Sequence, residues 1–148
     1  MEEMNGYAGG PSEEVEKCLH VLVVDNEEDI RGLLADLLTS AGHRVTAACD
    51  GNEALEIFSR EAIDLVITDL GLPVMSGWEV ARSIKKLAPG VMVAMITGWG
   101  ADFDDVQMLE SGIHTIVNKP FRTDQILNLA REVMAAKKTM QAEKSLTQ

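Results

Sequence analysis

Five short apolar runs, each bounded by turn residues, alternate along the chain with segments whose apolar residues recur at helical spacing. A continuous apolar run of this kind is typical of a strand that is buried on both faces of a parallel sheet. Parallel strands need helical crossovers, and those helices cover both faces of the sheet. The pattern therefore predicts an α/β fold, in which a doubly wound parallel sheet of five strands lies between two helical layers. The predicted strands are residues 19–24, 44–48, 65–67, 91–96 and 114–117, and the predicted helices begin near residues 28, 51, 77, 102 and 121.

The length of the chain, 148 residues, suits one domain with a single core and leaves little for a second. Residues 1–17 carry several Glu and Gly without apolar periodicity, which predicts a flexible acidic extension. The domain itself is predicted over residues 18–137. Residues 138–148 are predicted to be a polar tail into which the last helix fades.

Charge and composition exclude several classes of function. The net charge of −11 argues against direct binding to nucleic acid, because phosphates are neutralised by clustered Lys and Arg. No apolar run approaches the roughly 20 residues that cross a bilayer, and the N-terminus lacks the regions of a signal peptide. The two cysteines, Cys18 and Cys49, do not suggest a disulfide framework. We expect a cytoplasmic protein that makes no contact with a membrane.

Polar side chains follow four of the predicted strands. Asp25, Asn26 and Glu27 follow the first strand, Asp69 the third, Thr97 the fourth and Lys119 the fifth. The carboxyl ends of parallel strands meet at one edge of the sheet, which is where ligands bind in open α/β folds. Carboxylate and amide oxygens with open positions beside them suit Mg²⁺. The sequence therefore predicts a site for Mg²⁺ (or Mn²⁺) made by Asp25, Asn26 and Asp69.

Asp69, at the end of a buried strand, is a candidate nucleophile. A carboxylate that attacks phosphorus forms an acyl phosphate. The charge on the transferred group must be neutralised, for which the ammonium of Lys119 is suited, and the hydroxyl of Thr97 can bind a phosphate oxygen. Taken singly, each residue has a simpler explanation, as a turn-capping aspartate, a turn threonine or a surface lysine. Their joint placement at successive strand ends favours phosphoryl transfer.

Four motifs at these strand ends carry a family resemblance: Val23-Val24-Asp25, Asp69 with Leu72-Pro73 and Gly77, Ile96-Thr97-Gly98, and Lys119-Pro120-Phe121. Together they resemble the receiver domain of two-component response regulators, over residues 19–134. The resemblance implies a flavodoxin-like (βα)₅ fold with strand order 2-1-3-4-5. It also implies that Asp69 accepts a phosphoryl group from a histidine kinase or a histidine phosphotransfer protein in a Mg²⁺-dependent reaction. Such a domain is a signalling phosphoacceptor and not an enzyme, apart from self-phosphorylation and autodephosphorylation.

Further roles are implied residue by residue. Asp25 corresponds to the first member of the family's acidic pair, and Gly71 to the residue whose carbonyl binds the metal. Thr97 corresponds to the switch hydroxyl that responds to the phosphoryl group, and Lys119 to the lysine that contacts it.

Two positions depart from the family pattern. Asn26 stands where the second acid is usual, so the site loses one charge and we expect weaker Mg²⁺ binding. Ile116 stands where the family often has a Tyr or Phe that turns inward on activation. Isoleucine has no comparable rotamer swing, which leaves open how a movement of Thr97 is passed on. A simpler role for Ile116 is that of a core residue of the last strand.

The output surface is expected on the face formed by the last two helices and the last strand, where an unidentified downstream protein would bind. The chain is either a stand-alone regulator or a receiver cut from a larger protein. A pseudo-receiver that binds partners without phosphorylation is an alternative, supported by Asn26 and Ile116. A phosphohydrolase with an Asp nucleophile usually has a second acid two residues later, where this chain has Gly71. A flavin carrier needs a glycine-rich phosphate loop after the first strand, where residues 25–28 are mostly acidic.

Overall fold

The computed structural model describes residues 18–98 and 112–147. The strands are β1 His20–Val24, β2 Arg44–Ala48, β3 Leu65–Asp69, β4 Met92–Thr97 and β5 Thr115–Asn118. The helices are α3 Glu28–Ser40, α4 Gly51–Arg60, α5 Gly77–Leu87 and α7 Thr123–Thr147. All strand pairs are parallel and the order is β2-β1-β3-β4-β5, so the predicted flavodoxin-like sheet is confirmed. The helix predicted to begin near residue 102 lies outside the described residues.

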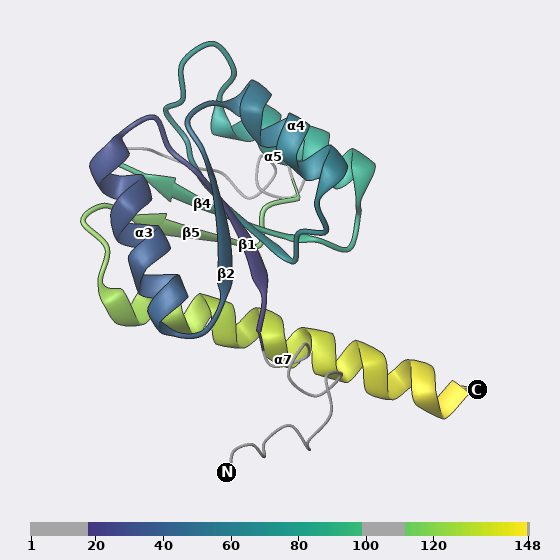
Figure 1. Cartoon of the computed structure of the whole chain (residues 1–148). Coiled ribbons are helices and arrows are strands. Elements are labelled where there is room, and N and C mark those ends of the chain that lie inside the picture. Colours follow the sequence, from purple (N-terminus) through teal and green to yellow (C-terminus); the bar gives the residue numbers. More distant parts are fainter. Residues whose placement is uncertain (1–17, 99–111, 148) are drawn as a thin grey trace.

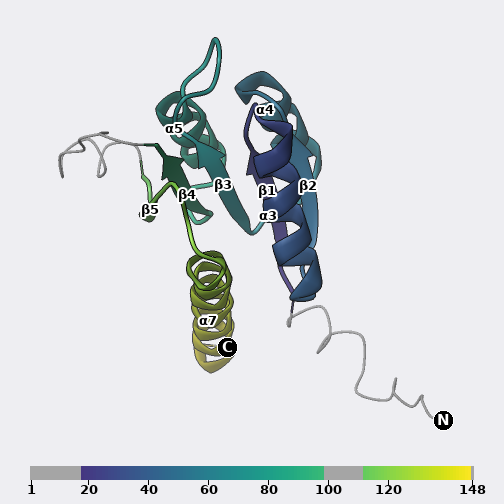
Figure 2. The ribbon, with the colours of Figure 1, turned by 90° about the vertical axis from the view of Figure 1, so that its left-hand side faces the viewer.

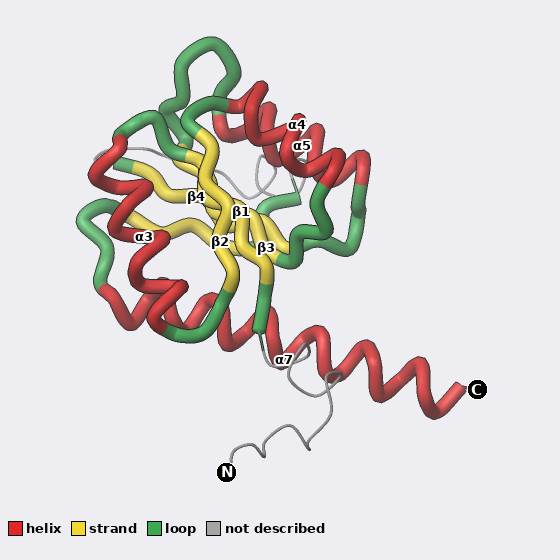
Figure 3. Tube along the Cα trace, in the orientation of Figure 1, coloured by secondary structure: helices red, strands yellow, loops and turns green. Residues whose placement is uncertain are grey.

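The sheet separates two apolar cores, which makes the molecule three layers thick. Val21 and Val23 of β1 belong to the core shared with α3 and α7, whereas Leu22 and Val24 belong to the core shared with α4 and α5. Figures 1 and 3 show the two helix pairs on opposite sides of the sheet, and Figure 2 shows β2 and β5 at its two edges. Because successive side chains of a strand point to opposite faces, a central strand covered by helices on both sides is apolar at most of its positions.

The connection from β3 to α5 is set by short-range signals. The Ser76 hydroxyl accepts a hydrogen bond from the Glu79 N–H, and the Glu79 carboxylate accepts one from the Ser76 N–H. This capping box satisfies donors that the first turn of a helix leaves unpaired, and it fixes the start of α5 directly after the loop. The Gly77 N–H donates to the Leu70 carbonyl at 2.9 Å, which ties the helix start back to the end of β3. The end of β3, which carries Asp69, is thereby held in place.

Helix α7 is longer than the sequence predicts. The expected fading near Lys137 is wrong, because the helix continues to Thr147 and extends past the sheet (Figure 1). Residues 138–147 contain no Gly or Pro and are mostly good helix formers, so nothing in them ends the helix. The Lys137 ammonium lies 2.9 Å from the Asp64 carboxylate, which joins α7 to the segment before β3. In the part of the chain that the structure describes, no helix is both long and apolar enough to cross a membrane.

His43 makes the stability of the fold depend on pH. Its Nδ1 accepts a hydrogen bond from the Leu19 N–H at 3.0 Å, and burial lowers the pKa of His43 below its usual value of 6.5. Below about pH 6.5, the usual pKa of histidine, the unfolded chain binds a proton that the folded chain excludes. The folded state is therefore destabilised as the pH falls below this value, and its full stability is present above it. We expect the Tm to decrease from about pH 7 to about pH 5, and less steeply in His43→Gln. Equal slopes in thermal unfolding of the two proteins would contradict this.

Candidate functional site

The ends of four strands bring the predicted polar residues to one edge of the sheet. Asp25 directly follows β1, Asp69 ends β3, Thr97 ends β4 and Lys119 directly follows β5. The Lys119 N–H donates to the Thr97 carbonyl at 2.7 Å, which fixes the start of the loop after β5 against the end of β4. The peptide bond between Lys119 and Pro120 is cis. Parallel register thus places side chains that are distant in sequence along a single edge.

The ammonium of Lys119 lies among three carboxylates. Its Nζ is 3.0 Å from Asp69 Oδ1, 3.5 Å from Glu27 Oε1 and 3.6 Å from Asp25 Oδ2. Burial alone would lower the pKa of Lys119, but the hydrogen bond with Asp69 and the three negative charges outweigh burial and raise it. Lys119 is therefore held in its charged form. It provides a fixed positive charge beside the Asp69 carboxylate.

Asp25 is the most deeply buried acid of the site, with 1% of its surface exposed. Its Oδ1 accepts a hydrogen bond from the Glu27 N–H at 2.8 Å, whereas its Oδ2 is buried without a hydrogen-bond partner. Burial raises the pKa of Asp25, and the nearby charge of Asp69 raises it further. The hydrogen bond from the Glu27 N–H and the charge of Lys119 lower this pKa, but they do not outweigh the rise. A buried carboxylate oxygen that accepts no hydrogen bond is suited to bind a cation.

The other predicted metal ligands lie after the ends of β1 and β3. The Gly71 N–H donates to Asp69 Oδ2 at 3.1 Å, so the loop folds back over the carboxylate. Asn26 is exposed beside Asp25. Within residues 18–98 and 112–147, no group of three or more His, Cys, Asp or Glu side chains is arranged to hold a metal ion. The predicted donors are the carboxylates of Asp25 and Asp69 and the neutral oxygens of Asn26 and Gly71, a set that would suit Mg²⁺ with several water ligands.

The two predicted switch residues differ in their surroundings. Thr97 is buried at the end of β4, and its hydroxyl donates a long hydrogen bond of 3.4 Å to the Gly98 carbonyl. Ile116 is half-buried in β5, where it pairs in register with Met95 of β4 and packs against the core shared with α4 and α5. Ile116 is thus a core residue of its strand in this structure. A role for either residue in switching stays a prediction.

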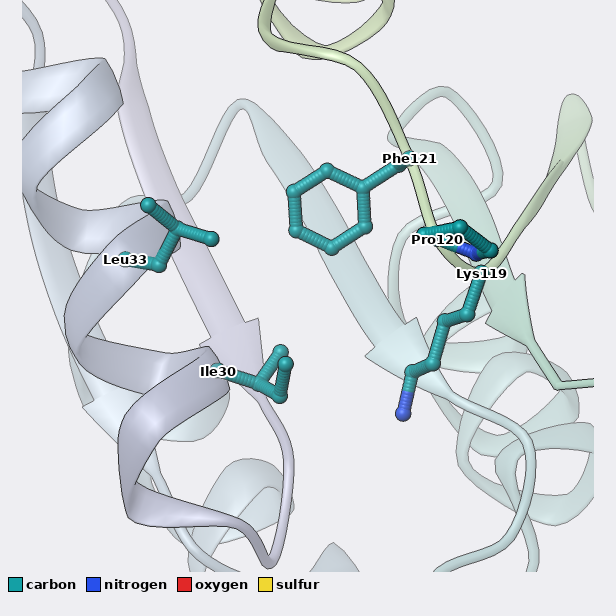
Figure 4. A pocket seen from close by; sticks show the side chains of 5 residues that line it. All are labelled: Ile30, Leu33, Lys119, Pro120 and Phe121. Atoms are coloured by element: carbon teal, nitrogen blue, oxygen red, sulfur yellow. The ribbon is translucent and has the colours of Figure 1, made fainter.

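An apolar pocket of about 330 Å³ opens beside Lys119. Figure 4 shows Ile30 and Leu33 of α3 facing Phe121 across the pocket, with Pro120 and Lys119 on the same side as Phe121. Leu33, which lines the pocket from α3, is 47% exposed. The pocket therefore joins exposed apolar surface to the charged site.

Sequence reasoning placed Glu27 at this edge of the sheet but gave it no role, and it gave Leu33 no part in the site. Glu27 follows Asp25 and Asn26 in the same polar cluster, but its contact with Lys119 arises only when β1 and β5 align at the sheet edge. Leu33 fits the apolar spacing of α3, a pattern that by itself indicates a side chain facing the core. Neither residue carries a local signal for its place in the site, because the residues it meets there lie in the loop after β5, far away in the sequence.

Two acids and a lysine at the carboxyl edge of a flavodoxin-like sheet are the arrangement expected of a receiver-type signalling domain. The family model described as the response regulator receiver domain matches residues 21–131. The chain belongs to the response regulator receiver domain family of two-component systems, which confirms the resemblance seen in its motifs.

Individual relatives agree with this assignment. A probable transcriptional regulator, ycf27 of Cyanidium caldarium, is 40% identical over 102 residues, which cover 69% of this chain and 41% of the relative. The sensor histidine kinase RcsC of Salmonella typhi is 35% identical over 106 residues, 72% of this chain and 11% of the kinase. A response regulator receiver domain protein from Clostridium thermocellum has a TM-score of 0.75 at 32% identity, covering 82% of this chain and 98% of that one. The chain thus spans less than half the length of these two curated relatives.

Proposed function

We propose that Asp69 accepts a phosphoryl group from the phosphohistidine of a histidine kinase or phosphotransfer protein, and that the resulting change of conformation is the signal. The observation that carries the proposal is the position of the Lys119 ammonium, 3.0 Å from Asp69 Oδ1 and 3.6 Å from Asp25 Oδ2, which accepts no hydrogen bond. A carboxylate so placed has a counter-charge ready for the group that it would receive.

In the proposed transfer, a carboxylate oxygen of Asp69 attacks phosphorus, and the bond from phosphorus to the imidazole nitrogen breaks. The imidazole leaves with the bonding electron pair and takes up a proton. Lys119 balances the charge on the phosphoryl oxygens throughout, because it already lies beside the attacking carboxylate. The Thr97 hydroxyl, at the end of the neighbouring strand, exchanges its long bond to Gly98 for a phosphoryl oxygen. Attack by water on phosphorus later breaks the bond to the Asp69 oxygen, which releases inorganic phosphate and restores the carboxylate.

The residues present fit a divalent cation with oxygen ligands. Asp25 and Asp69 would hold it, with the Gly71 carbonyl and the Asn26 amide oxygen as neutral ligands. When bound, Mg²⁺ (or Mn²⁺) supplies charge neutralisation and orientation for the phosphoryl oxygens. Asp25 Oδ2 supports this assignment, since it is buried and accepts no hydrogen bond, and a bound cation would give it a ligand bond instead.

The surfaces beside the site support the proposed protein partners. The apolar pocket between Ile30, Leu33 and Phe121 lies next to Lys119, where the phosphohistidine of the kinase would approach. The downstream protein would bind on the other side of the loop after β5, on the face formed by β5 and α7. A cavity of about 190 Å³ lies between these elements and is lined by Ile116, Gln125 and other residues. The net charge of −11 favours protein partners over nucleic acid.

The proposal is tested by incubating the protein with acetyl phosphate, with and without Mg²⁺, and measuring its intact mass. We expect the mass of one phosphoryl group to be added in Mg²⁺ and very little without it. The added group should be lost rapidly in base, as acyl phosphates are. An unchanged mass in Mg²⁺, together with no response of tryptophan fluorescence to beryllofluoride, would favour a pseudo-receiver that acts without phosphorylation.

Asn26→Asp should bind Mg²⁺ more tightly than the wild type. The substitution adds a carboxylate next to Asp25 without changing the size of the side chain, and the affinity of a hard cation rises with the charge of its ligands. We expect an increase in affinity on the order of tenfold, measured by calorimetric titration. Unchanged or weaker binding would show that Asn26 is not a metal ligand.

A further inference from the structure

Glu27 occupies a helix position for which glutamate is not preferred. It is the N-cap residue of α3, where Ser, Thr, Asp or Asn usually accepts a hydrogen bond from the first turn, yet its side chain makes no such bond. Its backbone is fixed on both sides, because its N–H donates to Asp25 Oδ1 and its carbonyl accepts from the Arg31 N–H. The side chain instead extends to Lys119, with 3.5 Å between the charged atoms.

This contact places Glu27 in competition with the phosphoryl group. The side chain of Glu27 is 63% exposed, so it lies at the outer side of Lys119, whereas Asp25 and Asp69 lie at the buried side. A phosphoryl group on Asp69 needs the Lys119 ammonium as its own counter-charge. It would also carry negative charge close to Glu27, and like charges repel at this distance. Lys119 must therefore weaken its pairing with Glu27 when Asp69 is modified.

We propose that Glu27 is a positioning residue, which draws Lys119 toward the outside of the site and lowers the affinity of the site for a phosphoryl group. This inference rests on the proposed function of Asp69. Because Asn26 removes the acid next to Asp25, Glu27 supplies the third carboxylate of the site from the outer side of Lys119. The unmodified state is thereby favoured until a partner delivers the phosphoryl group.

The test compares two variants that lose the same charge at neighbouring positions, Glu27→Gln and Glu28→Gln. Glu28 is the first residue of α3 and is exposed, so its replacement has a similar effect on the helix dipole. Beryllofluoride, which mimics a phosphoryl group on a carboxylate, is titrated in saturating Mg²⁺ while tryptophan fluorescence is recorded. The Tm and the Mg²⁺ affinity of each variant are measured separately, so that a general loss of structure or of metal binding is recognised.

We expect Glu27→Gln to bind beryllofluoride about two- to fivefold more tightly than the wild type at low salt, the effect of one partly exposed ion pair. The difference should shrink in about 1 M salt, because the charges are then screened, and Glu28→Gln should match the wild type. Equal changes in both variants, or unchanged or weaker binding in Glu27→Gln, would overturn the role of Glu27 alone. A wild-type protein that fails to bind beryllofluoride in Mg²⁺ would instead overturn the proposed function, and this inference with it.

Discussion

Asp69→Asn is expected to abolish uptake of the phosphoryl group. An amide oxygen is a far weaker nucleophile than a carboxylate, so no acyl phosphate forms at this position. The fold should persist, because the substitution preserves size and the amide oxygen can still accept the hydrogen bond from the Gly71 N–H. Lys119 loses its 3.0 Å contact with Asp69 but keeps its contacts with Asp25 and Glu27. Intact mass after incubation with acetyl phosphate and Mg²⁺ measures the loss.

Asp64→Asn provides a matched control for this variant. Asp64 directly precedes β3 at its amino end, where it pairs with Lys137, so the same chemical change is made next to the same strand but at the opposite edge of the sheet. This variant should take up the phosphoryl group as the wild type does. Retained uptake in Asp69→Asn would place the acceptor elsewhere, and peptide mapping of the modified protein would then locate it.

Gly77→Ala is expected to produce the largest loss of stability. A methyl group at this position would overlap the Asp69 carbonyl oxygen, and it would lie 2.7 Å from the Met95 sulfur and 2.9 Å from the Leu70 Cα. Two of these atoms are backbone, so the end of β3 or the start of α5 has to move. Overpacking of this kind typically costs about 1–3 kcal/mol and sometimes more, and we expect the upper end here. Urea denaturation followed by circular dichroism measures the free energy of unfolding.

The same change at Gly32 serves as the control. Gly32 lies in the exposed middle of α3, and a methyl group there would have no neighbour within 4 Å. Gly32→Ala should stabilise the protein by roughly 0.5–1 kcal/mol, because alanine loses less backbone entropy in a helix. Gly77→Ala should also reduce phosphoryl uptake, since it displaces the backbone of Asp69. Wild-type stability in Gly77→Ala would contradict the close approach of β3 and α5.

Most of the fold follows from local patterns in the sequence. The apolar runs that became β1 and β4 are continuous because both faces of the sheet are covered, and this continuity alone predicts parallel strands. The start of α5 is likewise encoded locally, by Ser76 and by Glu79 three residues later. The end of α7 was not predictable in this way. Its polar last residues resemble a tail in composition but contain nothing that stops a helix.

The residues of the candidate site were predictable from the sequence, but the contacts between them were not. The sequence by itself determined which chemistry is available, because Asp25, Asp69 and Lys119 each follow a recognisable strand, and parallel strands end at a common edge. Only the tertiary structure decided which of these charged groups contact one another. It leaves Asp25 Oδ2 buried without a hydrogen bond and brings Glu27 to Lys119. Such distances depend on how the loop after β1 and the loop after β5 are placed relative to each other across the sheet. These loops are far apart in the chain, so no local sequence pattern predicts their contact.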